Sequence, residues 1–89
     1  MDFQLQNKTV FVSGSYRGTG HTIAERFVSE GARVIVHAHN PDQLATLDLS
    51  PFAGSVVGDL GTQAGMAAVV DQIVKKYDTL DVLVNNYGI

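Results

Sequence analysis

The stretch that decides the fold is TVFVSGSYRGTG, residues 9–20. Its first four residues are apolar or β-branched, which is typical of a short buried strand. The remaining eight include three glycines, and beyond them apolar residues recur with helical spacing at Ile23 and Phe27. The pattern predicts a strand, a glycine-rich loop and a helix in that order. Gly31 is expected to end the helix, because helices commonly finish in a left-handed residue just past the last turn.

Three more strands are predicted from short apolar runs. They lie at residues 33–36, 55–58 and 80–84, and their β-branched residues favour strand over helix. Strands that alternate with helices through short connections pair in parallel by right-handed crossovers. The sequence therefore predicts an α/β fold with a parallel sheet.

The second and third helices have recognisable starts. Asn40 can accept a hydrogen bond from the first free amides of a short helix, and Pro41 fits the first helical position. Thr62 is expected to cap the third helix, with an ion pair between Asp71 and Lys75 on its wet side. The apolar stripe of that helix consists of Met66, Val69, Val70, Ile73 and Val74.

Composition and charge narrow the class of function. Nine acidic and six basic residues give a net charge of −3, and the basic residues are scattered, so no nucleic-acid partner is expected. No stretch approaches the roughly 18 apolar residues of a membrane span, and the first residues do not resemble a signal peptide. We therefore expect a cytoplasmic protein without a membrane partner. The lack of cysteine excludes disulfides, and three histidines without ligand spacing predict no metal site.

The glycine loop is the strongest sign of a binding site. It lies where a strand ends and a helix begins, so free helix amides and the positive end of the helix dipole suit a phosphate there. Gly14 permits the tight turn, Gly18 lets a phosphate approach the backbone, and Gly20 lets the helix pack closely. The alternative is that these glycines serve only turning and packing in a domain that binds nothing.

At this point the sequence resembles the short-chain dehydrogenase/reductase family, whose signature after the first strand is Thr-Gly-x-x-x-Gly-x-Gly. Ser13 replaces the threonine and keeps the hydroxyl. Asp59 matches the family's acidic residue after the third strand, and Asn-Asn-Tyr-Gly at residues 85–88 matches Asn-Asn-Ala-Gly after the fourth. Tyr87 departs from the family's alanine and places a large ring where the cofactor's ribose would lie.

The resemblance covers essentially the whole chain and implies its architecture. We expect a partial doubly wound, Rossmann-like parallel sheet of about four strands in order 3-2-1-4 with three helices. Residues 1–89 would form a single, incomplete dinucleotide-binding domain. In that order the fourth strand is a sheet edge, although its apolar residues suit a strand that is covered on both sides.

The family's cofactor is NAD or NADP, and the resemblance implies a site for its ADP part. An NAD enzyme usually places a carboxylate at the end of the second strand, but the segment there, HAHN at residues 37–40, has none. Arg17, His39 and Asn40 offer cationic and hydrogen-bonding partners for a 2′-phosphate, so NADP is favoured over NAD. The expected cofactor-binding residues are Gly14, Ser15, Arg17, Gly18, Thr19, Gly20, His39, Asn40, Asp59, Leu60, Asn86 and Gly88.

Simpler interpretations stay open for the polar residues. The resemblance implies that Asp59 accepts a hydrogen bond from the adenine amino group, with Leu60 beside the ring, but Asp59 also suits a helix cap or a solvated turn. His37 and His39 also fit a solvated strand end, and Arg17 a free surface charge. Asparagines at a strand exit often tie neighbouring loops together.

The family's acid/base pair is absent from this chain. The implied chemistry is hydride transfer between nicotinamide and a carbonyl or alcohol, with a serine and a Tyr-x-x-x-Lys pair. Four residues beyond Tyr16 and Tyr77 stand Gly20 and Asp81, so we expect no catalytic residue here.

Two functions therefore remain. The first is the N-terminal NAD(P)-binding portion of an oxidoreductase, a homo-oligomer that acts on a small carbonyl or alcohol only with the rest of the fold. The alternative is a non-catalytic nucleotide-binding or regulatory module that completes its sheet by association. A phosphate-accepting receiver-like domain is disfavoured, because residues 12–14 offer no acids to hold a divalent ion.

Overall fold

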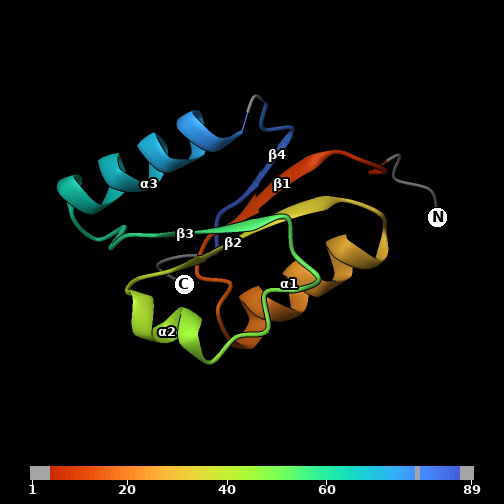
Figure 1. The fold of residues 1–89 in the computed structure, drawn as a ribbon, viewed down its shortest axis with the longest axis horizontal. Coiled ribbons are helices and arrows are strands. Elements are labelled where there is room, and N and C mark those ends of the chain that lie inside the picture. The colour runs from red at the N-terminus through yellow and green to blue at the C-terminus, as the bar shows by residue number, and fades with distance from the viewer. Residues whose placement is uncertain (1–4, 78, 87–89) are drawn as a thin grey trace.

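A computed structural model describes residues 5–77 and 79–86 of the chain. Within these residues the strands pair in parallel in the order β3-β2-β1-β4, which confirms the predicted topology (Figure 1). The elements in chain order are β1 (Thr9–Val12), α1 (Gly18–Ser29), β2 (Arg33–Ala38), α2 (Pro41–Ala45), β3 (Gly54–Val57), α3 (Gln63–Lys76) and β4 (Val82–Val84).

Helices α1 and α2 cover one face of the sheet, and α3 covers the other (Figure 1). On the face of α1 and α2, Ala24 packs with valines of β1 and β2. On the other face Val69 of α3 packs with Phe11, Ile35 and Val56. Successive side chains of a strand point to opposite faces, so β1 and β2 supply both layers. This explains their continuous apolar sequences, since both strands are buried on both sides.

The predicted helix ends are confirmed in detail. The Asn40 side chain accepts from the Gln43 amide at 3.1 Å, and the Gln43 side chain accepts in return from the Asn40 amide. Thr62 Oγ1 accepts from the Gly65 amide at 2.9 Å. Gly31 has a left-handed φ of 89°. The ion pair between Lys75 and Asp71 also forms, at 3.1 Å on α3.

Two strands differ in length from the prediction. β2 continues for two residues beyond Val36, because the polar ring of His37 is buried with hydrogen-bonding partners. β4 begins only at Val82. The Asp81 before it already bonds to β1: its carboxylate accepts from the Thr9 amide at 2.8 Å, and its amide donates to the Thr9 carbonyl.

The apolar stripe of α3 is only partly covered. Val69 is 2% exposed, whereas Met66 is 52% and Val74 is 70% exposed. Leu83 of β4 is 63% exposed, because β4 is the edge strand and nothing in the described part of the chain lies beyond it. The apolar patterns of α3 and β4 therefore include side chains that the described part of the chain does not bury.

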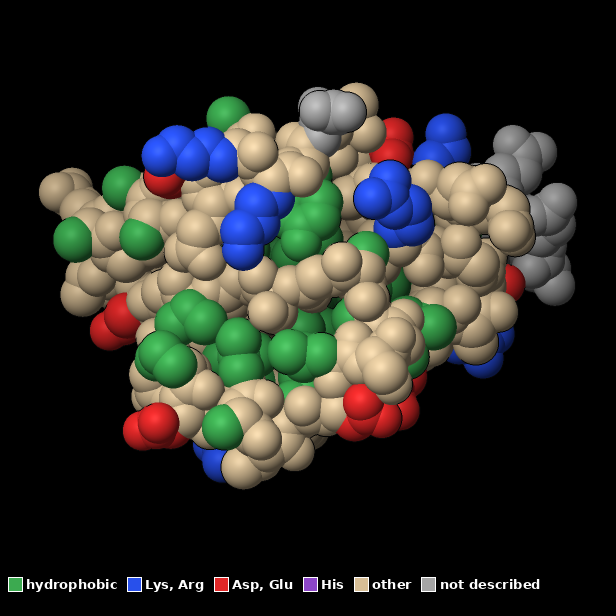
Figure 2. Space-filling view, viewed as in Figure 1, with side chains coloured by type: hydrophobic (Ala, Val, Ile, Leu, Met, Phe, Trp, Pro, Cys, Tyr) green, Lys and Arg blue, Asp and Glu red, His purple; other side chains and the backbone are tan. Residues whose placement is uncertain are grey.

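The charged side chains are dispersed over the surface. Figure 2 shows basic and acidic groups distributed around a hydrophobic area near the centre of the face that it presents. In residues 5–77 and 79–86 no helix is both long enough and apolar enough to cross a membrane.

Candidate functional site

The candidate site lies at the carboxyl ends of the parallel strands. The loops that follow β1, β2, β3 and β4 meet at this edge of the sheet. The chain turns to opposite sides of β1, because β2 pairs with one edge of β1 and β4 with the other. In open α/β sheets a crevice outside such a switch point is the usual place for a ligand.

The glycine loop takes the conformation that its sequence predicts. Gly14 and Gly18 have positive φ angles of 60° and 63°, which favour glycine strongly. A Cβ atom on Gly18 would have no other atom within 4 Å, so this backbone faces open space. Arg17 precedes α1 without a side-chain cap, and the first turn carries no acidic residue. The beginning of α1 is thus accessible to an anionic group.

Gly20 joins the helix to the loop and to the end of β4. A Cβ atom there would overlap the Gly14 carbonyl oxygen and lie 2.6 Å from Nδ2 of Asn86. Nδ2 of Asn86 donates to that same carbonyl at 3.4 Å, and the Asn86 amide donates to Ser13 Oγ at 2.8 Å. The Ser13 hydroxyl also bonds Asn85 Oδ1 at 3.3 Å. The asparagines therefore tie the strand exits together.

Ser15 has a different place from its neighbours in the loop. It is fully buried. Its hydroxyl donates to the Val12 carbonyl at 2.7 Å and accepts from the His37 amide at 2.8 Å, while its own amide donates to the His37 carbonyl. The side chain expected to contact the cofactor instead fastens the loop to β2.

His37 is the residue that sequence reasoning missed. Its ring is fully buried, Nδ1 accepts from the Gly14 amide at 2.8 Å, and Nε2 lies 2.8 Å from the Gly58 carbonyl oxygen. Burial lowers the pKa of His37; the bond to Gly58 opposes this, and nearby His39 adds to it. A solvated strand end is wrong for His37. The available signal was its alternation with Ile35, which places both side chains on the same face of β2.

The residues expected to bind a 2′-phosphate lie close together. A cavity of about 430 Å³ is lined by Tyr16, Arg17, Asn40, Asp42, Gln43 and Thr46. The Arg17 guanidinium lies 5.3 Å from the centre of the Tyr16 ring. The edge of the His39 ring meets Tyr16, with 6.1 Å between the ring centres. The Asp42 carboxylate shares the cavity and opposes an anion there.

His39 connects this cavity to Asp59, because its ring contacts both Tyr16 and the Asp59 carboxylate. Oδ1 of Asp59 lies 3.9 Å from Nδ1 of His39 and accepts from the Gly61 amide at 2.8 Å. The carboxylate is largely exposed and so remains open to a ligand. The backbone of Asp59 is in turn packed against Gly65 of α3.

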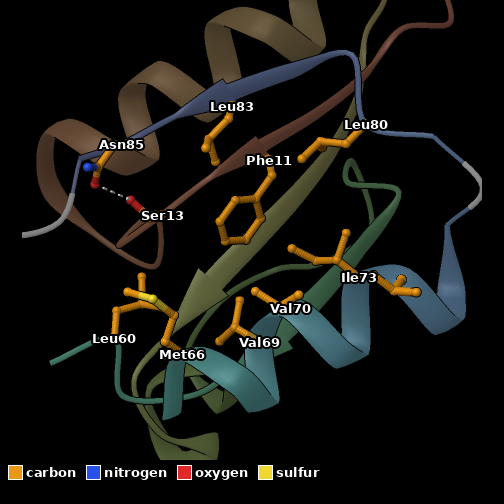
Figure 3. A pocket seen from close by; sticks show the side chains of 11 residues that line it. Phe11, Ser13, Leu60, Met66, Val69, Val70, Ile73, Leu80, Leu83 and Asn85 are labelled. Atoms are coloured by element: carbon orange, nitrogen blue, oxygen red, sulfur yellow. Dashed lines mark hydrogen bonds between the residues drawn. The ribbon is translucent and has the colours of Figure 1, made fainter. Parts of the chain in front are cut away.

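Leu60 points to a separate, apolar pocket. This pocket, also of about 430 Å³, lies between α3 and the strands β1 and β4. Figure 3 shows Val70 and Leu83 directed into the space around Phe11. The structure therefore does not place Leu60 among the side chains that line the Arg17 cavity. Two further residues of the motif, Tyr87 and the expected site residue Gly88, lie outside the described residues.

The described residues 5–77 and 79–86 contain no group of three or more His, Cys, Asp or Glu side chains able to hold a metal ion. At this edge of the sheet the structure brings together an open loop backbone at Gly18, a cation at Arg17 and an exposed carboxylate at Asp59.

Comparisons with known proteins define the class. The short chain dehydrogenase family profile matches residues 8–89, and the chain belongs to this family. Glucose 1-dehydrogenase 2 of Bacillus subtilis is 39% identical over 94% of the chain and 35% of its own length. A 3-oxoacyl-[acyl-carrier-protein] reductase of Chlamydia trachomatis is 37% identical over 96% of the chain and 37% of its own length.

Solved structures agree. L-sorbose reductase of Gluconobacter frateurii, determined with NADPH and L-sorbose, superposes with a TM-score of 0.88 and is 33% identical, over 100% of this chain and 36% of that one. A gluconate 5-dehydrogenase of Burkholderia cenocepacia, determined with NADP and tartrate, gives a TM-score of 0.83 at 31% identity, over 99% of this chain and 36% of that one. The chain thus spans about a third of the length of these relatives and matches their N-terminal portion. The alternative of a non-catalytic module gains no support from them.

Proposed function

We propose that this chain binds the ADP part of NADP(H) and is the N-terminal cofactor-binding portion of an NADP-dependent oxidoreductase. The observation that carries the proposal is that Arg17 of the glycine loop and Asn40 at the start of α2 line the same cavity. HAHN at residues 37–40 spans the last two residues of β2 and the two that follow, so no carboxylate occupies the position that would repel a 2′-phosphate.

The described residues fit the cofactor. The backbone at Gly18 and Thr19 would hold the pyrophosphate, because it is open and lies at the positive end of α1. Arg17 would pair with the 2′-phosphate as a charge-assisted donor, with His39 and Asn40 beside it. The exposed Asp59 carboxylate would accept from the adenine amino group. Asp42 opposes a phosphate in the same cavity, and Arg17 is the lining side chain whose positive charge offsets it.

Gly14, Gly20 and Asn86 act differently, since they shape the loop instead of lining the cavity. The bound cofactor supplies a hydride acceptor or donor. The chain's own residues bind and orient the adenosine end, and the acid/base residues belong to a later part of the complete protein. We propose a small carbonyl or alcohol as the substrate, in keeping with the sugar dehydrogenase and reductase names of the relatives.

The proposal is tested by cofactor affinity in a charge variant. Arg17→Ala should weaken NADPH binding about 10-fold to 100-fold, the worth of a charge-assisted hydrogen bond, and leave NADH binding within about twofold. Lys8→Ala is the matched control, because it removes a positive charge at the opposite end of β1. Isothermal titration of both cofactors gives the four dissociation constants. Equal losses for NADPH and NADH, or no loss, would contradict the role of Arg17.

We further propose that the complete protein is a cytoplasmic homo-oligomer. The apolar side chains exposed on α3 and β4 support association, because an uncovered apolar edge strand is seldom left free. Light scattering at several protein concentrations tests the oligomer. A monomer at every concentration would refute it.

A further inference from the structure

A buried histidine connects two of the loops that form the proposed cofactor site. The His37 ring lies between the Gly14 amide on one side and the Gly58 carbonyl on the other, each at 2.8 Å. Gly14 is the first glycine of the loop after β1, and Gly58 immediately precedes Asp59. The ring therefore spans from the phosphate cradle to the adenine side of the site.

The two partners determine the protonation state of the ring. A backbone amide can only donate, so Nδ1 must present its lone pair to Gly14. A carbonyl oxygen can only accept, so the proton is carried by Nε2. His37 is therefore the neutral Nε2–H tautomer. A second proton on Nδ1 would point at the Gly14 amide hydrogen and replace a hydrogen bond with repulsion.

The surroundings provide little compensation for a charge on this ring. The side chain is fully buried, and β1 faces it with the uncharged Phe11 ring, 6.0 Å away between centres. α3 approaches through Val69, which packs beside Gly58. The nearby titratable groups are His39, with 5.5 Å between the ring centres, and Asp59, whose carboxylate lies 3.9 Å from Nδ1 of His39. A charged His39 would further disfavour protonation of His37.

The shorter hydrogen bond of Gly14 is the one to His37. Gly14 has a φ of 60°; its amide donates to the His37 ring at 2.8 Å, and its carbonyl accepts from Asn86 at 3.4 Å. Ser13 and Ser15 hold the two sides of this turn, and His37 fixes the amide between them. Loss of the ring acceptor would leave a part-buried amide unsatisfied. Because Gly14 leads into the phosphate cradle, a change in this turn changes the cradle.

We propose that His37 is a positioning residue for the cofactor: its neutral ring holds the Gly14 turn in the binding geometry, and protonation of the ring in acid lowers the affinity of the site. This inference rests on the proposed function, since it concerns the same site. It assigns the acid sensitivity of binding to His37 and not to the more exposed His39.

The experiment separates the three histidines of the chain. NADPH dissociation constants are measured between pH 5 and pH 8 for the natural protein and for His37→Asn, His39→Asn and His21→Asn. Asparagine at position 37 retains an acceptor for Gly14 but neither titrates nor reaches Gly58. We expect binding about fivefold weaker at pH 7.5 in His37→Asn, the worth of one hydrogen bond.

The pH profiles carry the decisive comparison. The natural protein, His39→Asn and His21→Asn should share a component of affinity loss in acid that His37→Asn lacks. Nitrogen chemical shifts of the His37 ring in the natural protein should report the Nε2–H tautomer at pH 7.5, which does not depend on any variant folding. The opposite tautomer, or an unchanged acid loss in His37→Asn, would overturn the proposal. Failure of the natural protein to bind NADPH at pH 7.5 would instead refute the proposed function and leave the tautomer result to decide the state of the ring.

Discussion

Substitution of Gly20 by alanine tests the packing of the glycine loop, because packing and helix propensity predict opposite changes in stability. Alanine is the better helix former by about 1 kcal/mol, so helix propensity alone predicts that Gly20→Ala stabilises the protein. The structure predicts the reverse. The new Cβ atom would overlap the Gly14 carbonyl oxygen, and it would lie 2.6 Å from Nδ2 of Asn86.

The magnitude follows from these contacts. Overpacking against backbone costs about 1–3 kcal/mol, and loss of the bond from Asn86 to Gly14 costs about 1 kcal/mol more. After the gain in propensity, Gly20→Ala should lower the free energy of unfolding by about 1–3 kcal/mol. NADPH binding should weaken with it, because the displaced carbonyl belongs to the loop that would hold the phosphates.

Urea unfolding followed by circular dichroism measures the change. A double-mutant cycle with Asn86→Ala identifies its source, because removal of Nδ2 relieves one of the two clashes. The loss caused by Gly20→Ala should be smaller by about 1 kcal/mol in that background. A Gly20→Ala protein as stable as the natural one, or more stable, would refute the packing argument.

Other predictions follow from single contacts. Thr62→Ala should cost about 1 kcal/mol in urea unfolding, since it removes the cap of α3. Leu83→Gln should change stability by less than about 0.5 kcal/mol because Leu83 is largely exposed, whereas buried Val69→Ala should cost about 1–3 kcal/mol; equal effects would be contradictory. The pKa of His37 is lowered by burial, so its contribution to stability is complete above pH 6.5 and should be lost as the pH falls below that value toward the folded-state pKa, a trend that thermal melts should find reduced in His37→Asn. Burial raises the pKa of Tyr77, despite the opposing charge of Arg33, so stability should fall as the pH rises above 10, and Tyr77→Phe should lessen that fall in the same melts.

The sheet was predictable because its signals are local. Each strand is a short apolar run, α2 and α3 begin at the capping side chains of Asn40 and Thr62, and the alternation of strands and helices favours parallel pairing. The glycine loop was equally legible, because Gly14 and Gly18 take left-handed conformations that other residues rarely adopt. The resemblance to a family then supplied the strand order.

The roles of Ser15 and His37 depend on partners far along the chain. The donor and the acceptor that bond the His37 ring lie 23 and 21 residues away. Local alternation places His37 on the same face of β2 as Ile35, but it does not reveal these hydrogen-bonding partners. Ser15 carries a hydroxyl that suits a phosphate as well as it suits the interior. Only the position of β2 beside the loop turns that hydroxyl inward.

For α3 and β4 the sequence identified the apolar side chains but not whether they are covered. Helical spacing marks Met66 and Val74 as one face with Val69, yet only Val69 is covered in the structure. A periodic pattern identifies which face of a helix is apolar, but the element that covers that face is a property of the tertiary structure.

The proposed binding site can be located directly by titrating the ¹⁵N-labelled protein with NADP⁺ and following the backbone amide signals. The largest shifts should fall on Arg17, Gly18 and Thr19, with smaller shifts at Gly14 and Asp59. Adenosine 2′,5′-bisphosphate should reproduce the Arg17 shift, and adenosine 5′-monophosphate should not. Shifts confined to the apolar pocket between α3 and β4, or no shifts at millimolar NADP⁺, would contradict a cofactor site at the glycine loop.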